Sequence, residues 1–173
     1  MDTQRAPESL RMIATARRQT VELRNYRAAG SIVAVWGLVW LAGFGAQQFL
    51  PALAVWIWLV GWILALTWTA TRPRHDGDWR SLATWLVALG FVGLLLMVVG
   101  ADLRTAAMVF ALVLAASYLV LGIWAGHRFA LLGMLALITS CIGWWVAPAA
   151  LFIALALGGG GALILGGLWL QRP

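Results

Sequence analysis

The side chains that could carry chemistry are few in this chain and lie far apart. The stretch "HDGD" at 75–78 places one histidine and two carboxylates in a single polar segment. These groups are ligands for divalent cations, but a solvated turn with Gly77 at the bend is the favoured interpretation. The other histidine, His127, and the single cysteine, Cys141, match no metal-ligand spacing. The sequence therefore predicts no metal site.

Motifs for catalysis and nucleotide binding are also absent from the sequence. No candidate nucleophile has a base near it, and the "GGGG" run at 158–161 lacks the lysine of a phosphate-binding loop. One cysteine cannot form an intramolecular disulfide, and Cys141 is interpreted as a small buried apolar side chain. We therefore expect no enzymatic activity, no catalytic residue and no cofactor.

Two polar clusters lie within otherwise apolar stretches and are the candidate ligand-facing residues. They are Ser117 with Tyr118, and Thr139 with Ser140 and Cys141. If the two stretches pack as antiparallel helices, the clusters lie at a similar depth. Hydrogen bonding within or between helices is the simpler interpretation. A small polar pocket for a neutral or lipidic ligand is the alternative.

The composition is that of a protein embedded in lipid. The chain has 173 residues, of which 63% are hydrophobic and 10% are charged, and its mean hydropathy is +0.90. A soluble domain has about 25% charged residues, so this chain cannot present a wettable surface. Helices satisfy their own backbone hydrogen bonds in hydrocarbon. We therefore predict an all-α, polytopic integral membrane protein.

Six apolar runs have about the 20 residues that a helix needs to cross the hydrocarbon. The predicted spans are 30–47, 51–70, 82–100, 105–125, 128–146 and 148–170. They are expected to form one compact transmembrane bundle, 30–173. Residues 1–29 are polar and rich in arginine, which predicts an amphipathic helix in the cytoplasm or on the membrane surface.

All twelve basic residues are arginines, and their positions predict the topology. With six crossings, every arginine except Arg104 lies on the same side of the membrane. The positive-inside rule then places both termini in the cytoplasm. We assign the protein to a bacterial inner membrane. Anionic lipid head groups are the predicted partners of the arginines near the amino terminus, and they account for the net charge of +6 without any nucleic acid. These arginines are Arg17, Arg18, Arg24 and Arg27.

The last predicted span contains the tetraglycine at 158–161. Close backbone approach drives helix association in lipid, so a helix-packing surface is the first interpretation of its small residues. A hinge or unwound segment, as found at substrate sites in transporters, is the alternative. The small residues of this span recur every four positions, at Ala150, Ala154, Gly158, Ala162 and Gly166. A lesser series in the span at 105–125 leads to Gly122 and Gly126.

No aspartate, glutamate, arginine or histidine lies in the interior of a predicted span. Ion-coupled carriers usually hold an ionisable group within the bilayer, so this absence disfavours a coupled carrier. We predict a non-enzymatic packing, interaction or regulatory module that associates with a second copy or with another membrane protein. The alternative is a small oligomeric transporter of a neutral or lipidic solute.

Two parts of the sequence resemble a known group of proteins. The stretch "WGLVWLAGFG" at 36–45, which follows an arginine-rich lead, and the tail from Leu131 to Leu170 are similar to small six-span membrane proteins common in actinobacteria. Members are often described as transporters, without a known substrate. The resemblance covers the first span and the last two, about half of the chain. A looser similarity is to the six-span acid-resistance membrane family, built from paired glycine-rich helices. No catalytic residue transfers from either group.

The arginine distribution leads to a topology prediction. In a chain carrying Cys141→Ser, single cysteines at Asp2→Cys and Pro173→Cys should react with a membrane-impermeant maleimide from the same side. Inverted membrane vesicles should expose both cysteines, and right-side-out vesicles should expose neither. Labelling of the two positions from opposite sides would contradict an even number of crossings.

Overall fold

The computed structural model describes residues 29–71 and 79–172. Within these ranges every long element is a helix. The first helix, Ala29–Phe49, is followed by α2 (Pro51–Thr71), α3 (Trp79–Val99), α4 (Leu103–Ala125) and α5 (His127–Trp145). The predicted amino-terminal helix and the "HDGD" segment lie outside the described residues.

The last crossing consists of four consecutive helical pieces. A 3-10 turn at Pro148–Ala150 leads into α6 (Leu151–Ala154), and a π-helical segment, η3 (Leu155–Gly161), continues into α7 (Ala162–Leu170). The π-helical segment contains all four consecutive glycines. The crossing is therefore wound as helix through the tetraglycine, and it has no unwound stretch there.

Among the described residues, five helices are long and apolar enough to cross a membrane. They are the first helix, α2, α4, α5 and the continuous crossing Pro148–Leu170. The remaining long helix, α3, has a shorter described apolar stretch at Leu86–Val99. The helical, membrane-compatible class predicted from composition is confirmed.

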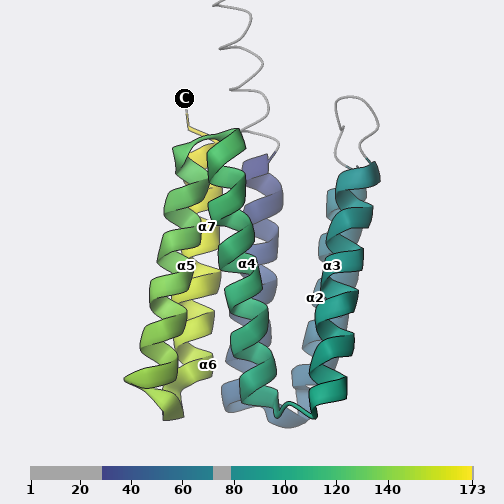
Figure 1. Cartoon of the computed structure of the whole chain (residues 1–173), viewed down its shortest axis with the longest axis vertical. Helices are drawn as coiled ribbons and strands as arrows, with labels where there is room; N and C mark the ends of the chain where they lie inside the picture. The colour runs from purple at the N-terminus through teal and green to yellow at the C-terminus, as the bar shows by residue number, and fades with distance from the viewer. Residues whose placement is uncertain (1–28, 72–78, 173) are drawn as a thin grey trace, which may run out of the picture.

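Successive helices run in opposite directions, so that the links alternate between the two ends of the bundle (Figure 1). The described amino-terminal end of the first helix and the carboxyl end of the chain lie at the same end (Figure 1). Gly126 forms the link between α4 and α5 with φ of 114°, a conformation that favours glycine. Arg128 and Arg172 follow at that end, while Arg104 begins α4 at the opposite end.

The buried core lies between the first helix, α4, α5 and the last crossing. Its largest member, Trp40, is 2% exposed and stacks on Phe110 of α4 with 5.5 Å between ring centroids. Leu151, Leu155 and Leu163 of the last crossing are equally inaccessible. These four helical units form the packed part of the bundle.

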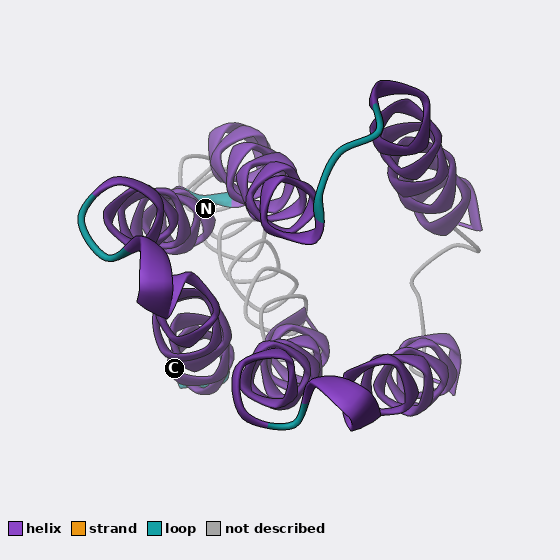
Figure 2. Cartoon of the chain, turned by 90° about the horizontal axis from the view of Figure 1, so that it is seen from below, coloured by secondary structure: helices purple, strands orange, loops and turns teal. Residues whose placement is uncertain are grey.

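The two remaining helices are packed less fully. The helix α2 contacts the first helix, where Trp36 donates a 3.3 Å hydrogen bond to Thr69 and meets the edge of Trp62. Figure 2 shows α3 standing apart from the other helices, and none of its described side chains, 86–99, is buried. The predicted compactness therefore applies to the core and not to α3.

The first helix and the last crossing approach each other through glycines on both sides. Gly30 and Gly37 of the first helix face Gly167 and Gly160 of the last crossing. A methyl group on Gly160 would lie 2.6 Å from the backbone nitrogen of Leu41 and 2.9 Å from the carbonyl oxygen of Gly37. Both distances are shorter than van der Waals contact, so this interface has no room for a side chain.

The tetraglycine offers a matched test of this contact. We expect Gly160→Ala to destabilise the bundle by about 1–3 kcal/mol, because overpacking forces backbone shifts. Gly161→Ala should change stability by less than about 0.5 kcal/mol, since nothing lies within 4 Å of the added methyl. Unfolding free energies measured by steric trapping in bicelles would compare the two. Equal effects of both substitutions would contradict a packed Gly160.

Candidate functional site

The series of small residues predicted in the last crossing faces α5. Gly158 lies against the side chain of Thr139, and Gly166 lies against Leu132. The methyl of Ala154 occupies the space beside Gly143 of α5. Ala162 is buried, and Ala150 is half-buried in the 3-10 turn. The structure thus gives the last crossing two contact faces, one towards α5 and one towards the first helix.

The two glycines predicted for packing near the end of α4 have different environments. Gly122 lies against Ala130 of α5, where an added methyl would come within 2.5 Å of the alanine methyl. Gly126 lies in the link itself, with its positive φ. The structure therefore places Gly122 in a helix contact and Gly126 in a turn.

The serine and threonine hydroxyls of the two polar clusters bond within their own helices. Ser117 donates to the carbonyl of Val113 at 2.7 Å, and Ser140, which is buried, donates to Ala136 at 2.7 Å. Thr139 donates to Leu135 at 2.9 Å. Such bonds to the preceding turn satisfy a hydroxyl in an apolar environment without a partner helix. These hydroxyls are accordingly engaged in the structure, and Cys141 is half-buried.

The structure does not bring the two clusters together. Tyr118 stacks on Phe129 of α5, with 6.3 Å between ring centroids and 12° between planes. Gly133 of α5 lies between Ala115 and Leu119 of α4, so Gly133 and Ser117 lie at about the same depth in the bundle. Thr139 is six residues further along α5, roughly 9 Å at 1.5 Å per residue. The expectation of similar depth therefore does not hold.

The described residues line a different candidate site, a partly open pocket that we call the aromatic cavity. It has a volume of about 190 Å³ and lies near the end of the bundle where the first helix passes into α2. Its walls come from the first helix, α2, α4 and the last crossing. The lining residues are Phe44, Gln47, Trp58, Trp62, Leu103, Ala107, Phe110 and Phe152.

Ring contacts hold the walls of the aromatic cavity in place. Phe44 meets the edge of Trp58 at 5.0 Å and lies nearly parallel to Phe152 at 6.3 Å. On the other side, the ring centroids of Phe110 and Trp62 are 6.3 Å apart, and Trp40 stacks on Phe110. Aromatic pairs at such separations are stabilising. The cavity is therefore lined by a preformed set of rings from separate helices.

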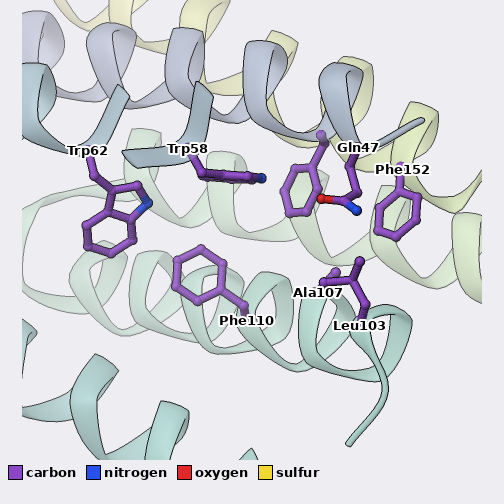
Figure 3. A pocket seen from close by; sticks show the side chains of 8 residues that line it. Gln47, Trp58, Trp62, Leu103, Ala107, Phe110 and Phe152 are labelled. Atoms are coloured by element: carbon purple, nitrogen blue, oxygen red, sulfur yellow. The ribbon is translucent and has the colours of Figure 1, made fainter. Parts of the chain in front are cut away.

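Gln47 carries the only amide side chain among the lining residues, and the indole N–H groups of Trp58 and Trp62 are the other polar groups. Figure 3 shows the Gln47 side chain pointing towards Ala107 and Leu103 on the facing helix. It forms no hydrogen bond with the described part of the chain. The neighbouring Gln48 carries a buried Oε1 that also lacks a described partner. Gln47 is half-buried, and its amide is available to a ligand in the cavity.

The start of α4 fixes one wall of the cavity. Asp102 caps this helix by accepting a 3.0 Å hydrogen bond from the backbone N–H of Thr105, and the Arg104 guanidinium donates to the carbonyl of Pro148. The pKa of Asp102 is lowered by hydrogen bonds from the side chain and the backbone of Thr105, with a smaller effect of Arg104. These contacts fix the start of α4 and thereby the positions of the lining residues Leu103 and Ala107.

The lowered pKa of Asp102 predicts a pH-dependent stability. A carboxyl group with a depressed pKa stabilises the folded state above its unfolded pKa of about 3.9, and the effect is lost as pH falls through the folded pKa. Asp102→Ala should therefore unfold more readily than the unmodified chain at pH 7 and equally readily in strong acid. Asp102→Asn keeps a good capping residue and should show a weaker pH dependence. A difference between Asp102→Ala and the unmodified chain that persisted in acid would contradict this assignment.

The sequence did not point to the residues of the aromatic cavity. The available signal was the two adjacent amides of Gln47 and Gln48 within an apolar run. Because the predicted span ends at Gln47, the prediction placed this side chain at the membrane interface. Within 29–71 and 79–172 no group of three or more histidine, cysteine or acidic side chains is placed to hold a metal. No protein-family model, curated protein or solved structure matches this chain. The geometry of its own residues therefore carries the functional argument.

Proposed function

We propose that this chain is a non-enzymatic integral membrane module that associates with a second copy of itself through the α2–α3 side. Its role is packing, scaffolding or regulation of a membrane component. The support comes from the unequal packing of the bundle, in which a tightly contacted core carries two helices with largely uncovered surfaces.

The exposure of α3 is the observation that carries this proposal. No described side chain of α3 is buried, and Met97 is 81% exposed. In α2, 11% of the residues in the most apolar stretch are buried, against 44% in the first helix and in the last crossing. This helix pair therefore has most of its described surface open to lipid or to another chain.

Two glycines of α3 leave room for the close approach of a helix partner. Gly90 and Gly93 have no atom within 4 Å of the position that a side chain would occupy. In the core, Gly37 and Gly160 meet a neighbouring backbone directly. Small residues allow the close backbone approach that drives helix association in membranes. The same residue type on α3 is thus available for a helix from a second copy.

The proposed setting is a bacterial inner membrane with both termini in the cytoplasm. Arg128 supports this topology, because its guanidinium lies 4.9 Å from the ring of Trp169 and donates to the carbonyl of Arg172. Arginine and tryptophan together are typical of a membrane interface. Binding of anionic lipids through the amino-terminal arginines remains part of the proposal, and those residues lie outside the described ranges.

A small transporter of a neutral or lipidic solute is the second candidate function. The aromatic cavity favours it, because the cavity offers space and one free amide. The tetraglycine does not add to that support, since Gly158 and Gly160 are occupied by contacts with neighbouring helices. The packing module therefore remains the better supported function.

Disulfide cross-linking tests association through α3. In a Cys141→Ser background, Leu94→Cys and Val98→Cys should give covalent dimers in native membranes under mild oxidation. Leu131→Cys is the matched control, because Leu131 of α5 is 55% exposed and Leu94 of α3 is 60% exposed. Both residues are thus equally accessible to lipid. Dimers at Leu131 alone, or no dimer at either α3 position, would rule out this interface.

A further inference from the structure

We propose that the aromatic cavity binds a neutral compound with one flat ring and a hydrogen-bonding oxygen, of the phenol or quinone type, taken from the bilayer. The inference is independent of self-association, because all its residues belong to one chain. It rests on the volume of the cavity, the arrangement of its rings and the free amide of Gln47.

The volume suits a single ring. An apolar cavity of about 150 Å³ inside a protein binds benzene, and the aromatic cavity measures about 190 Å³. The difference leaves space for a substituent on the ring. The walls are fixed by ring contacts between helices, so a larger ligand would have to extend through the open side of the cavity.

The walls favour a flat, unsaturated ligand over an acyl chain. Trp58 and Trp62 come from α2, and Phe110 faces them from α4 (Figure 3). Aromatic rings attract other rings in offset or edge-on arrangements at 4.5–7 Å between centroids, by about 0.5–1.5 kcal/mol beyond buried area. An acyl chain gains only the general apolar contact. The geometry therefore gives a ring an advantage over the lipid that surrounds the protein.

The Gln47 amide defines the polar part of the ligand. Its NH₂ group donates and its carbonyl accepts, and neither group bonds to a described residue. A hydroxyl or carbonyl oxygen on the ring would form a hydrogen bond with this amide. A ligand without oxygen or nitrogen cannot form that bond.

The ligand is expected to be uncharged. None of the residues that line the cavity is charged. The described arginine at this end, Arg104, donates to the carbonyl of Pro148. A phosphate or carboxylate in the cavity would therefore have no counter-charge, and burying an unpaired charge is prohibitively costly. Lipid head groups with a phosphate are excluded as occupants of the cavity on the same ground.

Binding of 4-fluorophenol to the full chain in lipid nanodiscs tests the inference by fluorine NMR. We expect saturable binding above the partitioning that empty nanodiscs show. Gln47→Leu should weaken this binding about tenfold, the effect of losing one hydrogen bond to the ligand. Fluorobenzene, which lacks the hydroxyl, should bind the unmodified chain and Gln47→Leu equally.

Filling the cavity is the second part of the test. Ala107→Leu should abolish saturable binding of both probes, and the smaller change Ala107→Val should weaken it if the leucine variant does not fold. Matched controls are Ala116→Leu, an exposed position of the same helix, and Gln48→Leu, the neighbouring amide outside the lining. Both controls should bind as the unmodified chain does. Binding that does not saturate, or that is unaffected by Gln47→Leu, or that is undiminished in the folded Ala107 variants, would overturn the proposal.

Discussion

Backbone contact between the first helix and the last crossing is the interaction on which the rest of the structure depends. Helices in lipid gain little from burying apolar side chains against one another, so their association relies on close van der Waals contact. Gly37 and Gly160 supply that contact by removing the side chains between two backbones. The adjacent Gly159 lies against the ring of Trp40, and Trp40 stacks on Phe110. A chain of contacts thus runs from the tetraglycine to the wall of the aromatic cavity.

The sequence predicted the helical units because hydrocarbon thickness sets their length. The predicted spans 105–125 and 128–146 lie within two residues of α4 and α5. The spacing of four in the last crossing also identified a face of small residues, which the structure places against α5. The second face could not be identified, because Gly30 and Gly37 are separated by seven residues within a run that is apolar on every side. Only the neighbouring helix reveals their role.

The candidate site was beyond sequence reasoning for a related reason. Helices that are apolar all round carry no polar stripe to indicate which side faces inward, so the rotation of each helix is not readable from its pattern. The aromatic cavity combines one to three residues from each of four helical units, and the relative rotation of those units decides whether Trp58 and Phe110 line one cavity or face lipid. The polar clusters attracted attention because hydroxyls are conspicuous in an apolar run. Their hydrogen bonds to the preceding turn show that polarity alone does not indicate a site.

The helix α2 connects the two proposals physically. One side of it supplies Trp58 and Trp62 to the cavity, while the other side is uncovered. It is attached to the core mainly through the first helix, by Trp36 with Thr69 and Trp62 and by Gly43 against Trp58. Its contact with α4 is the ring pair of Trp62 and Phe110. Any partner that shifts α2 relative to the first helix must therefore move two rings of the cavity wall. Conversely, a ring bound between α2 and α4 adds to the Trp62–Phe110 contact, and it holds α2 in the position that an associating copy would meet.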